Sequence, residues 1–298
     1  MDVLQRYADP DEDENFYSCA WTYDNASHLL CAAGERGIVR VINVTTHRGE
    51  RSLVGHGNSI NDLRFHQRDP LLLLSASKDH SLRLWNVKTG ACIAILGGVD
   101  GHRDEVLSGD FDIGGRYVVS CGMDHALKTW DLGDVNADSR RRGDDGPSFS
   151  SEVVHFPLFS TRIVHRNYID CVRWLGQLVL SKSCENAIVL WKPPGMGDDD
   201  DGGNVDSTPI VLHTFEMNNC EIWYLRFALD YFQTVLACGN QAGRVFLWDL
   251  EADKIDSPVQ LIHPKCDAPI RHVGFSRCGN IMVTVSDNVT VWRWDRRM

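Results

Sequence analysis

The chain has 298 residues, and its 41 acidic and 30 basic side chains give a formal net charge of −11 at pH 7. This excess argues against a protein that mainly binds nucleic acid, because such domains usually carry a basic face. The apolar runs are short and the acidic N-terminal stretch lacks the basic and apolar regions of a secretion signal, so we expect neither a membrane span nor secretion.

The ten cysteines are scattered without a Cys-x-x-Cys pair, and the twelve histidines lack the spacing of metal ligands. In a chain without a signal peptide such cysteines stay reduced and act as small buried side chains. We therefore expect no metal site and no cofactor. The sequence also lacks a phosphate-binding loop, a Rossmann fingerprint and the common hydrolase motifs, so we expect no enzymatic activity.

A repeating pattern runs through the chain, with a turn residue, an alternating strand, and a bulky side chain before a polar one. The two clearest copies end at Trp85 and Trp130, and weaker copies end at Ile42, Trp191, Trp248 and Trp292. A spacing of about 44 residues between ordinary copies is typical of the WD-repeat β-propeller, which has four strands in each blade. The sequence therefore predicts an all-β propeller with six visible blades.

We expect one propeller domain over residues 1–298. Its repeats are predicted at residues 14–44, 55–87, 101–132, 165–193, 219–250 and 266–295. Two polar insertions rich in Gly and Asp, at residues 133–160 and 193–212, lengthen the spacing, and their composition predicts flexible surface loops.

Three residue types recur at matching places in the two fullest repeats: a Gly-His pair, a turn aspartate and a final tryptophan. They are His56, Asp79 and Trp85 in one repeat and His102, Asp124 and Trp130 in the next. In WD repeats generally, these side chains complete a polar network around the buried indole N–H. The His–Asp pairs resemble a catalytic relay, but we interpret them as structural.

The first strand of each repeat has the pattern apolar–x–x–apolar–x–apolar, as in Ile60–Phe65 and Ile222–Phe227. The innermost strand of each blade is expected to begin here, so its two variable positions should open toward the central channel at one face. These positions hold Tyr17, Asn61, Leu107, Asp170, Trp223 and Arg271, each followed by Ser18, Asp62, Ser108, Cys171, Tyr224 and His272 respectively.

Three aromatic residues, Tyr17, Trp223 and Tyr224, thus occupy these rim positions, with the Asp170 carboxylate elsewhere on the rim. Three ring faces around one point would suit a quaternary ammonium ligand through cation–π attraction. The alternative is that the rings pack under loops, and the pattern alone favours neither interpretation.

Several stretches resemble one family more specifically than they resemble a generic WD repeat. They are Asp13–Trp21, Gly55–Asn58, Gly97–Val106, His165–Leu175, Leu180–Ile188 and Trp292–Arg296. The chain resembles the embryonic ectoderm development/extra sex combs family, the propeller subunit of Polycomb repressive complex 2. Outside the insertions, the resemblance runs from residue 4 to the end of the chain.

The resemblance implies a non-catalytic, nuclear histone-mark reader that acts in chromatin repression with other subunits of the complex. Family members bind trimethyl-lysine of the histone H3 tail in an aromatic cage. They stimulate an Enhancer of zeste-type methyltransferase, whose N-terminal helix lies on the opposite propeller face. The cage residues match Tyr17, Trp223 and Tyr224, and residues around the channel mouth match Arg226, Asn61, Lys78, Tyr168 and Asp170.

One departure from the family concerns the number of blades. The family has seven, and its first blade carries a fourth cage aromatic, whereas this sequence starts just after that blade. We therefore expect six visible blades of a seven-bladed ring, as a fragment, a shortened isoform or an incomplete gene model, or else a ring that closes differently. An open ring would expose two sheet edges.

Two other functions fit parts of the sequence. A generic propeller scaffold, such as a ubiquitin-ligase adaptor or a G-protein-β-like hub, would have no methyl-lysine site and no reason to place three aromatic residues at the rim. Direct binding of RNA or DNA is disfavoured by the acidic charge and by the lack of an aromatic–basic surface pattern.

Overall fold

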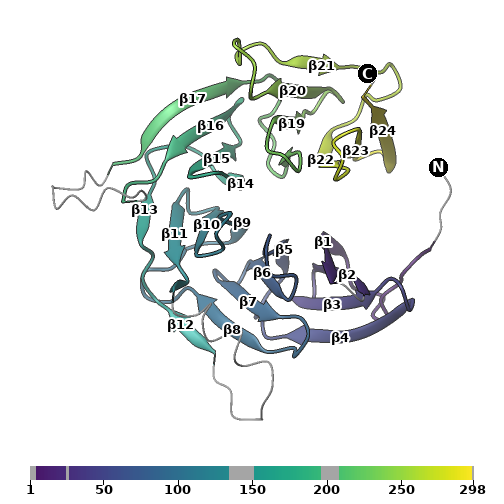
Figure 1. Ribbon diagram of the computed structural model, residues 1–298, viewed down its shortest axis with the longest axis vertical. Coiled ribbons are helices and arrows are strands. Elements are labelled where there is room, and N and C mark those ends of the chain that lie inside the picture. The colour runs from purple at the N-terminus through teal and green to yellow at the C-terminus, as the bar shows by residue number, and fades with distance from the viewer. Residues whose placement is uncertain (1–4, 25–26, 134–150, 196–207, 297–298) are drawn as a thin grey trace. The chain divides into compact units, whose positions relative to one another are not determined.

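The computed structural model describes residues 5–24, 27–133, 151–195 and 208–296, which form the six blades of an all-β WD-repeat propeller (Figure 1). The fold class predicted from the sequence is thereby confirmed. The chain divides into two compact units, of which one contains residues 1–109 and 132–156 and the other contains residues 110–131 and 157–298.

The first unit contains one four-stranded sheet, in the order β1-β2-β3-β4, and one five-stranded sheet, in the order β12-β8-β7-β6-β5. The strands are β1 (Phe16–Asp24), β2 (Ser27–Gly34), β3 (Ile38–Asn43), β4 (Arg48–Val54), β5 (Ile60–Phe65), β6 (Leu72–Ser77), β7 (Leu82–Asn86), β8 (Cys92–Leu96) and β12 (Glu152–Val154). Neighbouring strands are antiparallel except for β12, which pairs parallel to β8.

The remaining sheets have the orders β13-β11-β10-β9, β14-β15-β16-β17, β18-β19-β20-β21 and β22-β23-β24, and the boundary between the units falls within β9. Their strands are β9 (Val106–Phe111), β10 (Tyr117–Gly122), β11 (Leu127–Asp131), β13 (Phe159–Thr161), β14 (Ile169–Leu175), β15 (Leu178–Ser183), β16 (Ala187–Lys192), β17 (Ile210–Glu216), β18 (Phe227–Leu229), β19 (Val235–Gly239), β20 (Val245–Asp249), β21 (Val259–Leu261), β22 (Ile270–Phe275), β23 (Ile281–Ser286) and β24 (Thr290–Asp295).

The inner strands are buried on both faces, and their polar residues are buried together with the apolar ones. All six residues of β6 are buried, and so are all six of β9. The tryptophans that end the two fullest repeats, Trp85 and Trp130, are among the largest fully buried side chains. Within the described part of the chain, no helix is long and apolar enough to cross a membrane.

The predicted loop insertions differ from the structure at their ends. Residues 134–150 and 196–207 lie outside the described residues, but β12 forms and β13 begins within the first insertion, and β17 begins at Ile210 within the second. These strands were missed because the composition was averaged over each insertion. A strand of three residues such as β12 also has too few side chains to show an alternating pattern. β12 also pairs the edge of β8, which would otherwise be open.

Candidate functional site

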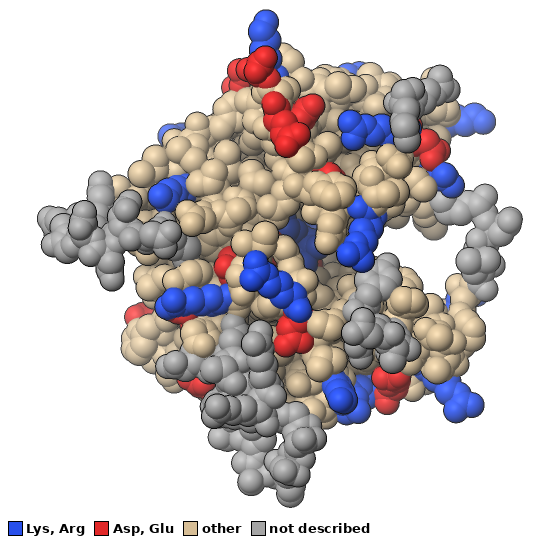
Figure 2. Space-filling model, in the orientation of Figure 1, with Lys and Arg blue, Asp and Glu red and all other residues tan. Residues whose placement is uncertain are grey.

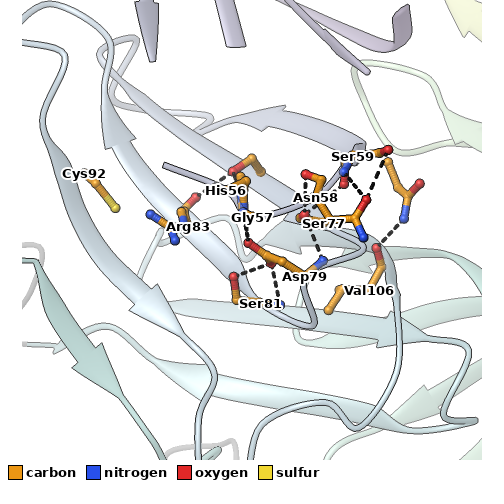
Figure 3. Close-up of polar contacts among 12 residues, drawn as sticks. His56, Gly57, Asn58, Ser59, Ser77, Asp79, Ser81, Arg83, Cys92 and Val106 are labelled. Atoms are coloured by element: carbon orange, nitrogen blue, oxygen red, sulfur yellow. Dashed lines mark hydrogen bonds and ion pairs between the residues drawn. The ribbon is translucent and has the colours of Figure 1, made fainter. Parts of the chain in front are cut away.

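A buried hydrogen-bonded relay crosses the blade formed by β5–β8. His56 Nδ1 lies 2.7 Å from Asp79 Oδ2, and Asp79 Oδ1 accepts a bond from Ser81 Oγ at 2.6 Å (Figure 3). His56 Nε2 lies 2.6 Å from Ser75 Oγ, which also accepts a bond from Trp85 Nε1 at 2.8 Å. Because these polar atoms bind one another inside the blade, the relay supports the structural interpretation of His56, Asp79 and Trp85.

The serine at the centre of the relay was missed by sequence reasoning, although its spacing was a usable signal. It lies ten residues before the tryptophan, as Ser75 does before Trp85. In the next blade Trp130 Nε1 donates to Ser120 Oγ at 2.9 Å across the same spacing. His102 in that repeat is buried, and Asp124 Oδ1 accepts a bond from the backbone N–H of Ala126 at 3.1 Å.

A further relay, also missed, lies in the blade formed by β14–β17. Trp191 Nε1 donates to Ser181 Oγ at 3.0 Å, and His165 Nε2 lies 2.7 Å from the same oxygen. His165 Nδ1 is 3.4 Å from Glu185 Oε2. The usual sequence motif is lost here because Val164 precedes the histidine and a glutamate replaces the aspartate.

In the last blade the tryptophan at the repeat position is Trp294 rather than the predicted Trp292. Trp294 pairs in register with Met282, and its Nε1 donates to Thr284 Oγ1 at 3.2 Å, again ten residues earlier. Trp292 Nε1 donates to Thr290 Oγ1 at 2.9 Å. Since residues two apart point to the same side of a strand, the alternating pattern alone could not separate these two tryptophans.

In the blade formed by β18–β21, sulfur atoms take the place of the relay. Cys238 occupies the position of the relay serine, and Trp248 Nε1 has no hydrogen-bond partner among the described residues. Cys220 Sγ lies 3.8 Å from the Gly239 carbonyl oxygen and 4.0 Å from Met217 Sδ. Apolar packing therefore stabilises this blade without the hydrogen-bonded relay.

The relays carry histidines and carboxylates with shifted pKa values. Burial lowers the pKa of His56 and of His165 below the ordinary 6.5, although an adjacent carboxylate opposes the shift in each case. The pKa of the Asp79 carboxyl is lowered. Burial alone would raise this pKa, but the hydrogen bond and charge of His56 outweigh burial, together with the hydrogen bonds from Ser81 and the Gly57 N–H. The folded relay therefore favours neutral imidazoles beside ionised carboxylates.

We expect the free energy of unfolding to decrease as the pH falls from about 7 to about 5. In this range the unfolded chain takes up protons at its histidines before the folded His56 and His165 do, so their stabilising contribution is complete above pH about 6.5 and is lost below it. Urea unfolding at a series of pH values measures the slope. Replacing both residues with Gln should flatten it, whereas the same change at the exposed His47 should not, and an unchanged slope in the double variant would contradict the prediction.

The aromatic rim residue of the first unit is Tyr17, which lies on β1 and is half-buried. Its hydroxyl donates a hydrogen bond to the Glu35 carboxylate. Lys78 Nζ lies 5.9 Å from the centre of the Tyr17 ring. The Tyr17 ring is therefore oriented by the Glu35 carboxylate and lies near the Lys78 ammonium group, both within the first unit.

The two variable positions of β5 lie below the surface, so the expectation that they open toward the channel is wrong for Asn61 and Asp62, which are each 2% exposed. Asn61 Nδ2 donates to the Val106 carbonyl oxygen at 2.9 Å. The Asp62 carboxylate accepts bonds from Ser18 Oγ at 3.3 Å and from Ser108 Oγ at 2.7 Å. These buried side chains form hydrogen bonds between the neighbouring inner strands β1, β5 and β9.

The aromatic rim residues of the second unit form a turn just before β18. The ring centres of Trp223 and Tyr224 are 5.7 Å apart, with an angle of 76° between the planes, and Trp223 is 43% exposed. The Arg226 guanidinium lies 4.6 Å from the Tyr224 ring centre, although Arg226 itself is buried. The apolar pattern predicted a strand from Ile222 onward, but β18 begins only at Phe227 because the turn precedes it.

Asp170 lies beneath this turn and is fully buried, which corrects the expectation of a solvent-facing rim carboxylate. One of its oxygens accepts bonds from the backbone N–H groups of Tyr224, at 2.7 Å, and of Leu225, at 3.2 Å. Both oxygens lie 3.2 Å from Lys182 Nζ, which is also buried. Tyr168, by contrast, is exposed and packs edge-to-face against His125 at 5.3 Å between ring centres.

The structure thus brings together Trp223, Tyr224, Arg226 and Asp170 in the second unit, and Tyr17 and Lys78 in the first. Among the described residues, no three His, Cys, Asp or Glu side chains come close enough together to hold a metal ion. On the face shown in Figure 2, basic and acidic side chains are interspersed and other residues form most of the surface. Among the residues drawn in colour, Lys and Arg do not form the continuous basic surface typical of nucleic-acid binding.

Known proteins similar to this chain share both its repeats and its fold. The WD domain, G-beta repeat family matches residues 49–86 and 90–131. The chain is 47% identical to Polycomb protein esc of Drosophila melanogaster, over 100% of this chain and 73% of that protein. It is 41% identical to Polycomb group protein FIE1 of Oryza sativa subsp. japonica, over 98% of this chain and 78% of that protein.

The fold also matches a solved structure, that of ctPRC2, the Chaetomium thermophilum Polycomb repressive complex 2, in complex with H3K27me3 and H3K27M. The TM-score is 0.84, the sequences are 24% identical, and the match covers 99% of this chain and 85% of that one. At this identity the likeness concerns the fold alone.

Proposed function

Because the chain belongs to the family of Polycomb WD-repeat proteins that includes esc and FIE, we propose that it is the non-catalytic reader subunit of a Polycomb histone methyltransferase complex. The edge-to-face pair of the exposed Trp223 and the half-buried Tyr224 carries this proposal. Two aromatic rings held at a surface turn can receive a trimethylammonium group against their electron-rich faces.

Tyr17, Trp223 and Tyr224 are the proposed cage. Their support is the matching place in the repeat sequence, where Tyr17 lies on β1 while Trp223 and Tyr224 lie just before β18, and the resemblance to the family cage. Lys78 and Tyr168 are proposed to surround it and contact the peptide, whereas the buried Arg226 is proposed to support the Tyr224 ring. Asn61 and Asp170 are proposed to act from beneath, since both are buried and hydrogen-bonded to backbone groups.

The proposed partners follow from family membership. A fold relative has been solved as part of a complex that holds H3K27me3, and we assign this chain the same kind of ligand, a histone H3 tail with trimethylated lysine. An Enhancer of zeste-type methyltransferase subunit would bind the propeller face opposite the cage and be stimulated when the mark is bound. The protein would act on chromatin in the nucleus, as part of a repressive complex.

Titration of the purified chain with histone H3 tail peptides tests this function. We expect the peptide trimethylated on lysine to bind more tightly than the same unmodified peptide, because only the methylated ammonium loses little hydration when rings enclose it. Isothermal titration calorimetry measures both dissociation constants. Equal affinities for the two peptides would favour a generic scaffold without a methyl-lysine site.

A further inference from the structure

We propose that Asp170, paired with Lys182, is a positioning residue that fixes the Trp223–Tyr224 turn in its ligand-binding geometry. This inference rests on the proposed reader function and assigns the buried pair to it. All four residues belong to the second unit, and neither Asp170 nor Lys182 can touch a ligand at the surface, because both are fully buried.

The turn adopts a backbone conformation that a tyrosine rarely takes. Tyr224 has a φ of 68°, in the left-handed region that favours glycine. Residues in such conformations persist where surrounding contacts over-determine them, and they cluster at functional sites. At this turn the conformation also directs two successive backbone N–H groups, those of Tyr224 and Leu225, to one Asp170 oxygen. Converging N–H groups of this kind bind an anion.

Asp170 reaches the turn from an irregular point of its own strand. The register of β14 against β15 shifts between Ile169 and Cys171, so Asp170 is the extra residue of a β-bulge. Bulges redirect a side chain out of the regular ladder, and the same bulge recurs at the equivalent position of β1, β5 and β22. Lys182 on β15 compensates the buried carboxylate, since its Nζ bonds both Asp170 oxygens and the Ser183 carbonyl oxygen, the last at 3.1 Å.

The other side of the turn is held by Arg271. Its Nη1 donates to the Trp223 carbonyl oxygen at 2.9 Å, and its guanidinium forms two bonds of 2.7 Å with the Asp287 carboxylate. The Arg271 carbonyl oxygen accepts a bond from the Arg226 N–H at 3.0 Å. With Arg271 fixing the first residue of the turn and Asp170 the next two, the two aromatic rings have little freedom to move apart.

The test compares the full chain with the double variant Asp170→Asn/Lys182→Met. Removing both charges together avoids an unpaired buried ion, which would destabilise the fold by itself. We expect the double variant to keep its cooperative unfolding but to lose at least about fivefold in affinity for the trimethylated H3 peptide. Its affinity for the unmodified peptide should change less, and exchange of the Tyr224 and Leu225 amide hydrogens should become faster. The matched control, Arg116→Met/Asp131→Asn, removes a surface ion pair between the residue before β10 and the end of β11, and it should change neither the peptide affinities nor the amide exchange.

Three outcomes decide between the possibilities. If the unaltered chain prefers the methylated peptide and the double variant retains that preference, the positioning role is overturned. If the double variant does not fold, the variant Asp170→Glu is used instead, because it keeps the ion pair but moves the carboxylate. Unchanged selectivity for the methylated peptide together with unchanged amide exchange in that variant overturns the positioning role. If the unaltered chain shows no preference, the reader function fails, and slow amide exchange that accelerates in the variant still supports Asp170 as the residue that holds the turn.

Discussion

Replacing Trp85 with alanine is expected to lower the free energy of unfolding by about 3–5 kcal/mol. The indole is only 1% exposed and packs in the core cluster that includes Leu73 and Val87. The substitution leaves a cavity that the surrounding sheets can fill only in part, and it also removes the N–H that binds Ser75. Urea unfolding followed by far-ultraviolet circular dichroism measures the loss.

Two other variants separate packing from hydrogen bonding in this experiment. Ser75→Ala keeps the indole but removes the oxygen that binds Trp85 and His56, and it should cost about 1–3 kcal/mol. Trp21→Ala, at a tryptophan that is 49% exposed, should cost less than Trp85→Ala. A Trp85→Ala protein that unfolds at the same urea concentration as the parent would show that this indole is not part of the core.

Replacing Trp223 with alanine should weaken binding of a trimethylated H3 peptide at least about tenfold, or roughly 1.4 kcal/mol, and leave the fold intact. A trimethylammonium over a tryptophan face gains about 0.5–2 kcal/mol, depending on desolvation. The loss should exceed the lower end of that range because Trp223 also packs edge-to-face against Tyr224, and that contact is lost with it. Calorimetric titration of both proteins with the same peptide gives the ratio of dissociation constants.

Trp223→Phe is the matched control, because it retains a ring face and should lose less affinity. Thermal unfolding of each variant should match the parent, since nearly half of the Trp223 surface is exposed. If the parent prefers the methylated peptide while Trp223→Ala binds it equally well, the reader function stands and the cage assignment is wrong.

The architecture could be predicted because each blade repeats one arrangement with few substitutions. A turn aspartate, an alternating strand and a closing tryptophan recur in the copies ending at Trp85 and Trp130, and this pattern gave six blades and the WD-repeat fold. Where residue types changed, the pattern failed. Glu185 in place of aspartate hid the relay of His165, and two tryptophans on one face of β24 hid the register of the last blade.

The sequence predicted which residues occupy the rim positions but not which of their side chains are buried. The strand pattern placed Asn61, Asp170 and Trp223 at equivalent positions, yet two of these side chains are buried and one is exposed. Strand periodicity says which side of a sheet a residue faces and nothing about which backbone groups its side chain binds. The bulge at Asp170 recurs at the equivalent position of β1, β5 and β22, whereas the left-handed conformation of Tyr224 is held by Asp170, a residue distant in the sequence.

The sulfur-lined blade of β18–β21 has a consequence for local opening. The Trp248 indole N–H lacks the serine partner found in other blades, and the two edge strands of the sheet, β18 and β21, have three residues each. Segments with few cross-links open at lower free energy than the rest of a domain. Because β18 directly follows the Trp223–Tyr224 turn, a ligand bound at the turn would also restrict local opening of this blade. Part of its binding free energy would then offset the conformational entropy that the blade loses.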